Sequence, residues 1–140
     1  MKEFEYYLKK GVVKKVSKDI NLAKSLLKDI EIRMKQINKL NKKDFAKIIY
    51  ENIYDSIRDF CDSLLALEGY KSYSHQASII FLKKYGVDNA LITKIDIARN
   101  LRNESKYYGE EIKKTDVKTI QEIYNKLQNK INEVKKSLIK

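Results

Sequence analysis

The sequence predicts an all-α protein, an antiparallel up-and-down bundle of four main helices plus a shorter helix. Apolar residues recur every three or four positions, the 140 residues include no proline, and only four glycines interrupt the pattern. Short connections between long amphipathic segments favour antiparallel neighbours. No strand pattern, internal repeat or low-complexity tract competes with the helices, so we expect one helical domain over residues 1–140.

The first long helix is predicted over residues 19–40, after a short amphipathic turn at the N-terminus. Ser17 or Asp19 is its candidate N-cap. Its apolar face consists of Ala23, Leu26, Leu27, Ile30, Met34, Ile37 and Leu40. A second long helix is predicted to start near Asn41 and to end at Gly69. The broad apolar face of this second helix predicts that it is the central and most buried one.

A shorter helix is expected over residues 73–85. Gly86 closes it, because glycine readily adopts the left-handed conformation that ends many helices. Asp88 is the predicted N-cap of the next helix, which reaches residue 107 or 108 and is ended by Gly109. The last helix is predicted to start with Thr115 as its N-cap and to continue to the C-terminus.

The net charge is strongly positive, with 30 Lys and Arg against 19 Asp and Glu, or +11. Such an excess is typical of proteins with an anionic partner such as nucleic acid. Only four of the basic residues are arginine, however, and the chain is also rich in isoleucine. Coding in an A+T-rich genome produces the same bias, so both interpretations of the charge stay open.

Most catalytic classes lack their sequence motifs here, since the chain has no Walker loop, GxGxxG, HExxH or GxSxG. One cysteine, Cys61, and one histidine exclude an internal disulfide framework and a Cys-rich or His-rich metal site within one chain. Cys61 falls on the apolar face of the central helix, where it is expected to fill the core. We expect no metal ion and no cofactor.

The N-terminal residues carry charges every few positions, without the apolar run of a signal peptide. No later stretch approaches 18 uninterrupted apolar residues. We therefore expect a cytoplasmic protein without a membrane partner.

The most informative stretch is ARNLRNESKYYGE, residues 98–110, which holds half of the arginines. Arg99 and Arg102 are three positions apart and are neighbours on a helix surface, with Asn103 beside them. Planar guanidinium groups next to an amide suit the recognition of phosphate oxygens. A simpler interpretation is that the two arginines interact with the helix dipole or pair with Asp96 or Glu104.

Two segments in this order, YDSIRDFCDSLLALEGYKSYSHQASIIFL at residues 54–82 and ARNLRNESKYYGEEI from residue 98, resemble the HEPN family. Members of this family are compact helical bundles of prokaryotes that often form homodimers and often occur beside minimal nucleotidyltransferases. Many of them are metal-independent RNases. The resemblance implies an RNA or nucleotide ligand, a nucleotidyltransferase partner protein and a role in a toxin–antitoxin system. It covers most of residues 17–138.

The family's nuclease motif places a histidine four to six residues after an arginine, and this chain departs from it. Counted from Arg102, those positions include Tyr107 and Tyr108. Tyrosine is a poor base at neutral pH, although it donates hydrogen bonds and stacks on bases. On an unbroken helix either tyrosine points about 120–140° away from Arg102. The helix must therefore bend before Gly109, or the groups must meet across a dimer, if they act together.

Three hypotheses follow. In the first, Arg99, Arg102, Asn103 and His75 bind RNA or nucleotide phosphate, Tyr107 or Tyr108 stacks on a base or forms a hydrogen bond, and the module does not cleave RNA. In the second, Arg102 with Tyr107 or Tyr108 forms the active site of a metal-independent endoribonuclease. In the third, the chain is a structural protein-interaction bundle whose charge is compositional.

The remaining polar residues leave alternatives open as well. His75 either caps or packs the short helix or lines the groove of Arg102. The acidic stripe of Asp55, Asp59 and Asp62 is expected to be a solvated face rather than a partner of the arginines. Tyr50 and Tyr54, one helical turn apart, are expected to be core or dimer contacts.

Overall fold

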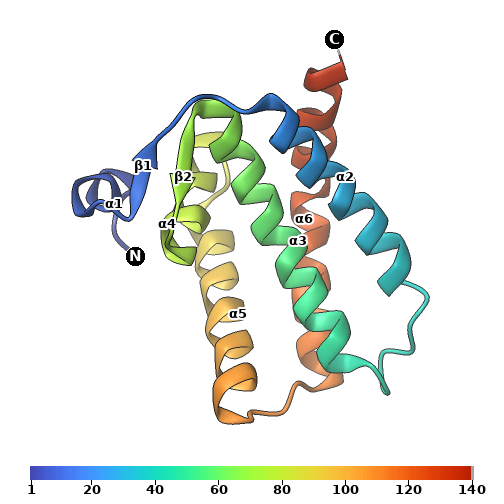
Figure 1. Cartoon of the computed structure of the whole chain (residues 1–140). Coiled ribbons are helices and arrows are strands. Elements are labelled where there is room, and N and C mark those ends of the chain that lie inside the picture. The colour runs from blue at the N-terminus through green and yellow to red at the C-terminus, as the bar shows by residue number, and fades with distance from the viewer. Residues whose placement is uncertain (140) are drawn as a thin grey trace.

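The computed structural model describes residues 1–139 and contains four main helices in up-and-down order (Figure 1). They are α2 (Ile20–Ile37), α3 (Ala46–Glu68), α5 (Asn89–Tyr108) and α6 (Lys114–Ile139). Helix α3 lies at the centre and packs against the other three. The shorter helix α4 (His75–Ile80) continues as the 3-10 turn η1 (Phe81–Tyr85) and connects α3 to α5. The predicted all-α antiparallel bundle is confirmed.

Most of the predicted helix ends are confirmed by their capping interactions. The side chains of Asp19 and Asp88 accept hydrogen bonds from the backbone N–H groups of Leu22 and Leu91, at 2.9 and 2.8 Å. These bonds satisfy N–H groups that have no partner within the first turn of α2 and α5. At the other ends, α3, η1 and α5 are closed by three glycines in the left-handed conformation, Gly69, Gly86 and Gly109.

The predicted start of α3 was five residues too early. The side-chain oxygen of Asn41 accepts hydrogen bonds from the backbone N–H groups of Lys43 and Asp44, at 2.8 and 3.2 Å. This local turn offers the backbone an alternative to a helix. Helix α3 therefore begins only at Ala46.

The predicted N-cap of the last helix was also wrong. Helix α6 begins at Lys114, so Thr115 lies inside its first turn. Asp116 accepts a hydrogen bond from the backbone N–H of Lys113 at 2.8 Å, and this contact fixes the start of the helix. The shorter helix starts at His75 rather than at residue 73, because the Ser74 hydroxyl caps it.

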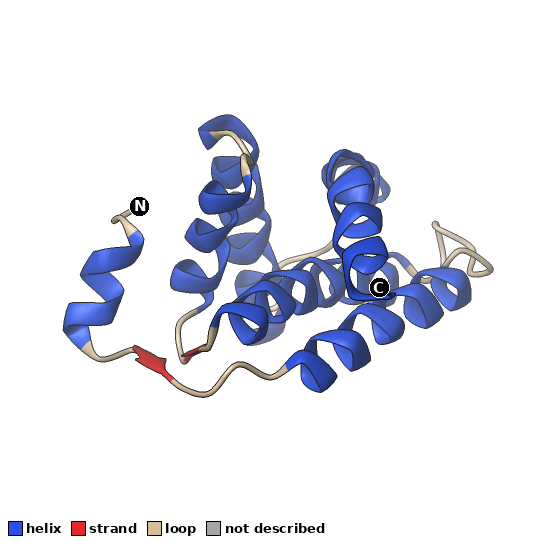
Figure 2. Cartoon of the chain, turned by 90° about the horizontal axis from the view of Figure 1, so that it is seen from above, coloured by secondary structure: helices blue, strands red, loops and turns tan. Residues whose placement is uncertain are grey.

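The N-terminal segment is more ordered than the predicted turn. It forms helix α1 (Phe4–Lys10) and strand β1 (Val13–Lys15), which pairs antiparallel with β2 (Tyr70–Ser72) directly after α3. This small sheet corrects the expectation that the chain has no strand. The ring of Phe4 packs on Phe81 with centroids 4.7 Å apart. Figure 2 shows α1 and β1 as an arm along one side of the bundle.

The core lies around α3, as its broad apolar face predicts. Its largest side chains with no exposed surface include Ile53, Ile57, Phe60 and Leu64. Cys61 is also fully buried, and burial raises the pKa of its thiol, so this cysteine fills the core as predicted. Within residues 1–139, no helix combines the length and the apolar composition that crossing a membrane requires.

Candidate functional site

Three of the four arginines surround the only histidine of the chain. We call Arg58 on α3, Arg99 and Arg102 on α5, together with His75 on α4, the arginine cluster. The pKa of His75 is lowered from its ordinary value of 6.5 to about 4, first by burial and then by the positive charges of Arg58, Arg102, Arg99 and Lys106. His75 is therefore neutral at pH 7 in a positive electrostatic environment.

The cations on α5 share one face of that helix. Arg99, Arg102, Asn103 and Lys106 follow one another at intervals of three, one and three residues, which keeps them within about one-quarter turn of one another. Asn103 is half-buried beside Arg102, and Lys106 is exposed. The predicted neighbourhood of Arg99, Arg102 and Asn103 therefore exists on the surface of α5.

Tyr54 connects Arg102 to His75. Its ring is buried, and its hydroxyl lies 2.9 Å from Nδ1 of His75. The guanidinium carbon of Arg102 stands 5.5 Å from the centroid of the same ring, within the range of a cation–π contact. Burial raises the pKa of Tyr54, so its phenol stays protonated. His75 thus packs on Tyr54 and also lies close to Arg102, which combines the two roles that the sequence left open.

Each carboxylate of the predicted acidic stripe pairs with an arginine, so the expected solvated face is wrong. Asp55 lies 3.6 Å from Arg102, and Asp62 lies 3.4 Å from Arg58. The third carboxylate, Asp59, pairs with Arg33 of α2 and is described below. The pairs of Asp59 and Asp55 cross from α3 to α2 and α5, which a helix-surface pattern does not reveal, whereas Asp62 pairs with Arg58 one turn earlier on α3 itself.

Arg99 has the shortest contact within the cluster. Its Nε donates to Asp96 one turn earlier on α5 at 2.8 Å, as one of the interpretations of the sequence predicts. The side chains of Arg99 and Asp96 are only 16 and 20% exposed, respectively. Tyr7 of α1 lies near enough for Asp96 and Arg99 to influence its pKa, which places the N-terminal arm beside this pair.

Two guanidinium groups of the cluster keep unused donors. The Nε atoms of Arg58 and Arg102 are buried, and neither has a hydrogen-bond partner among residues 1–139. Arg58 Nε is within ion-pair distance of Asp62, but the geometry does not make a hydrogen bond. Arginine carries five N–H donors, and buried donors without partners are uncommon in folded proteins. Both Nε atoms are closed to solvent, while the two side chains as a whole are 19 and 16% exposed, so an anionic ligand would meet these groups at their exposed atoms.

The structure does not bring Tyr107 and Tyr108 to the arginine cluster within one chain. Helix α5 continues without a break to Tyr108, and Gly109 comes after both tyrosines. Their side chains are 66 and 86% exposed and point about 120–140° away from Arg102. The bend that the second hypothesis requires is therefore absent, and only a contact between two chains can join these groups.

Sequence reasoning missed Arg58 and the contact between Tyr54 and His75. Arg58 lies on the central helix, 41 positions before Arg99, and only the packing of α3 against α5 brings them together. The available signal was the rarity of arginine. A chain that uses lysine for 26 of its 30 basic residues has four arginines, and each of them pairs with an aspartate.

Within residues 1–139, no group of three or more His, Cys, Asp and Glu side chains is arranged to hold a metal ion. No family model, curated protein or solved structure matches this chain. Its function must therefore be argued from the site.

Proposed function

We propose that the chain is an HEPN-like module that binds the phosphates of RNA or of a nucleotide at the arginine cluster. The observation that carries this proposal is the grouping of three arginines around a neutral histidine, two of them with an Nε–H donor that no other residue uses. The resemblance of residues 54–82 and of the stretch from residue 98 to the HEPN family adds the biological setting. That setting is a homodimer in a toxin–antitoxin or nucleotidyltransferase-partnered system.

Arg102 has the ion pair that a phosphate displaces most easily. Its ion pair with Asp55 is the longest in the cluster, at 3.6 Å, and the Asp55 side chain is 44% exposed. An ion pair of this length with an exposed carboxylate contributes little free energy, although the Arg102 side chain itself is only 16% exposed, so replacing this carboxylate with a phosphate costs little. A phosphate also accepts two parallel N–H groups from one guanidinium, which adds geometric specificity.

The histidine adds a third donor in one of its two tautomers. When the Tyr54 hydroxyl donates to Nδ1 of His75, the proton of the neutral imidazole is on Nε2. No group within residues 1–139 forms a hydrogen bond with that nitrogen. His75 then supplies a neutral N–H to a phosphate oxygen that Arg102 holds by charge.

The test is the binding of a fluorescently labelled single-stranded RNA to the full chain, measured by anisotropy at about 150 mM salt. Arg102→Ala is expected to weaken binding by on the order of tenfold or more, since a hydrogen bond to a charged group contributes about 1.5–3 kcal/mol. Arg33→Ala is the matched control, because Arg33 also pairs with an aspartate of α3 but projects from α2, and it is not among the charges that act on His75. It is expected to change the affinity less than about twofold.

Equal losses in the two variants contradict the proposal. So does a loss that appears only when scattered lysines are replaced, because nonspecific binding by the whole charge behaves in that way. Either result favours the third hypothesis, a structural interaction bundle whose charge is compositional.

A second candidate function, metal-independent RNA cleavage, is favoured by the contact between His75 and Tyr54 rather than by Tyr107 or Tyr108. In the other tautomer, Nδ1–H of His75 donates to Tyr54, and Nε2 carries a free lone pair. It takes the proton of a ribose 2′-hydroxyl while the 2′-oxygen bonds to phosphorus. The bond to the 5′-oxygen breaks, and that oxygen takes a proton from water. Arg102 stabilises the added negative charge on the phosphate.

Cleavage of end-labelled RNA in excess chelator tests this second function. If the chain has this second function, His75→Ala and Arg102→Ala both abolish cleavage, whereas Tyr107→Phe and Tyr108→Phe still cleave the RNA. Intact RNA with the unmodified, folded protein excludes cleavage and leaves the binding proposal in place. Loss of cleavage in a tyrosine variant alone would favour an active site shared between two chains.

A further inference from the structure

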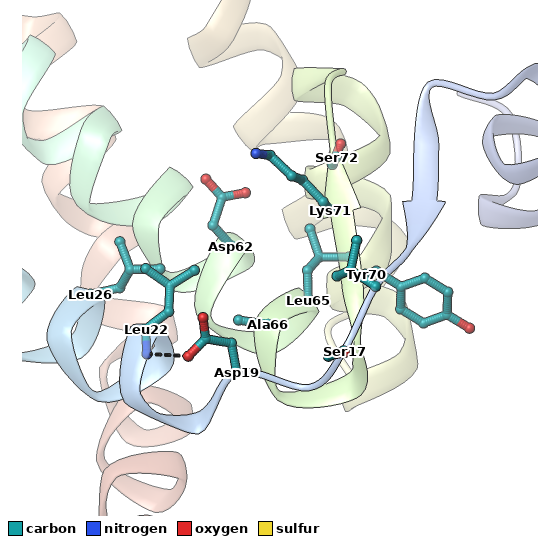
Figure 3. A pocket seen from close by; sticks show the side chains of 11 residues that line it. Ser17, Asp19, Leu22, Leu26, Asp62, Leu65, Ala66, Tyr70, Lys71 and Ser72 are labelled. Atoms are coloured by element: carbon teal, nitrogen blue, oxygen red, sulfur yellow. Dashed lines mark hydrogen bonds between the residues drawn. The ribbon is translucent and has the colours of Figure 1, made fainter.

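A cavity of about 510 Å³ lies next to the arginine cluster, between the start of α2, the end of α3 and strand β2 (Figure 3). Leu22, Leu26 and Leu65 line its apolar part. Asp62 and Lys71 extend to the same side of the cavity, and Asp19, whose side chain caps α2, is its third charged residue. A volume of this size and a mainly apolar lining with a few polar groups are typical of small-molecule sites.

The backbone holds this cavity open. The N–H of Val16 donates to Gly69 O at 2.8 Å, and the N–H of Asp19 donates to Ala66 O at 2.9 Å. A Cβ on Gly69 would lie 2.7 Å from Val16 O, so the close approach of these two segments requires glycine, which also has a φ of +83°. The start of α2 is thereby fixed, and Leu22 stays 47% exposed instead of closing over the cavity.

Asp62 joins the cavity to the arginine cluster. One of its oxygens is 3.4 Å from Arg58 Nε, and the other accepts from the Ser78 hydroxyl at 3.4 Å. Both contacts are long, and each carboxylate oxygen has two lone pairs, so Asp62 can accept further N–H groups. Burial raises the pKa of Asp62, which shows that this carboxylate is incompletely solvated.

We infer that the cavity binds a guanine base whose phosphate lies against Arg58 and Arg102. This inference rests on the proposed function and names the ligand of the same site. The Watson–Crick edge of guanine presents two adjacent N–H donors, which suit the two oxygens of Asp62, next to the O6 acceptor, which suits the Lys71 ammonium. Uracil presents one N–H between two carbonyl oxygens, and a carboxylate repels those oxygens.

The distances along α3 fit a nucleotide. Asp62 and Asp55 are seven residues apart, so they lie on one face of α3 and are separated by about 10 Å along the helix axis. Arg58 lies between them, and Arg102 contacts Asp55. A base at Asp62 therefore places its phosphate near Arg58 and Arg102 without any movement of the helices.

Calorimetric titration of the full chain with GMP, UMP and ribose 5-phosphate tests the inference. We expect GMP to bind on the order of tenfold more tightly than UMP or ribose 5-phosphate, because it adds paired hydrogen bonds with a charged group. Asp62→Asn is expected to reduce the affinity for GMP to that for UMP. Leu26→Trp fills the cavity and is expected to have the same effect, whereas Ile32→Trp, at an exposed position of α2, is the control.

The outcomes separate the base pocket from the phosphate site. If GMP, UMP and ribose 5-phosphate bind equally and Leu26→Trp changes nothing, the guanine pocket is wrong while phosphate binding stands. If none of the three binds, and labelled RNA does not bind either, the proposed function and the pocket both fail. A comparison of single-stranded RNA that contains one guanine with oligouridine shows whether the guanine comes from RNA or from a free nucleotide. If the protein binds the guanine-containing RNA more tightly than oligouridine but does not distinguish GMP from UMP, the pocket binds a guanine of RNA.

Discussion

Two carboxylates on one face of α3 pair with arginines of two different neighbouring helices, and the two contacts differ in how completely the arginine is satisfied. Towards α2, Arg33 donates to Asp59 at 2.8 Å and to the Ser56 hydroxyl at 3.2 Å. Towards α5, Arg102 reaches Asp55 only at 3.6 Å, and its buried Nε has no partner among residues 1–139. The same residue types therefore form a contact that joins two helices towards α2 and a contact open to a ligand towards α5.

The largest difference between the two contacts is expected in their coupling free energies. A double-mutant cycle of Arg33→Met and Asp59→Asn is expected to give about 1–2 kcal/mol, because the pair is half-buried and forms a short, charge-assisted hydrogen bond. The matched cycle of Arg102→Met and Asp55→Asn is expected to give less than about 0.5 kcal/mol. Urea denaturation of the unmodified protein, the four single variants and the two double variants measures both coupling free energies.

The stability lost in Arg33→Met is expected to depend on pH. Burial raises the pKa of Asp59 and Arg33 lowers it, so removing Arg33 raises it further. A folded-state pKa above the unfolded value means that the folded protein binds the proton more tightly, and lowering the pH through that pKa favours folding. The deficit of Arg33→Met should therefore shrink as the pH falls. Equal coupling energies for the two contacts would contradict the comparison.

An intermediate effect is expected in the titration of His75, which reports the positive potential on the α5 side. Its imidazole should titrate with a midpoint of about 4 by NMR. Arg102→Met is expected to raise the midpoint and Arg33→Met to leave it unchanged, because Arg102 is among the positive charges that act on His75 and Arg33 is not. The folded pKa lies below the ordinary 6.5, so the stability that neutral His75 contributes is lost as the pH falls from about 6.5 to 4. A midpoint near 6.5 would show that the arginines do not surround it.

The smallest effect is expected at the exposed end of α5. Tyr107→Phe and Tyr108→Phe should change the free energy of unfolding by less than about 0.5 kcal/mol, since both hydroxyl groups are in solvent. RNA binding by the monomer should also stay the same, since neither tyrosine reaches Arg102. A marked loss of RNA binding in either variant would place a tyrosine in the site and point to a second chain. Thermal unfolding and the anisotropy assay measure the two quantities.

The sequence predicts those parts of the fold that have local signals. Glycines and capping aspartates mark the helix ends, and periodic apolar residues mark the faces that pack on α3. The start of α3 was missed because the Asn41 side chain forms its own turn, a competition that periodicity does not show. Strands β1 and β2 were missed because three-residue strands that pair across the chain carry no periodic pattern.

The site was predicted to the extent that it lies on one helix. The spacing of Arg99, Arg102 and Asn103 shows that they share a face of α5. It does not show that Arg58 and His75 lie opposite them, because those contacts depend on how α3 and α4 pack. Whether Tyr107 and Tyr108 can face Arg102 depends on whether α5 is continuous between them. The helix ends only at Gly109, after both tyrosines, so both point away from Arg102.

The N-terminal arm has a consequence for synthesis of the chain on the ribosome. Lys15 of β1 pairs with Tyr70 of β2, so the arm must wait for 55 further residues before its partner strand is made. At typical translation rates of about 5–20 residues per second, this wait is roughly 3–11 s. During it, Phe4 and Tyr7 have no core to cover, because their partners on η1 and α5 follow later still. The segment that is made first is thus fixed in place only after α3, β2 and η1 have been made.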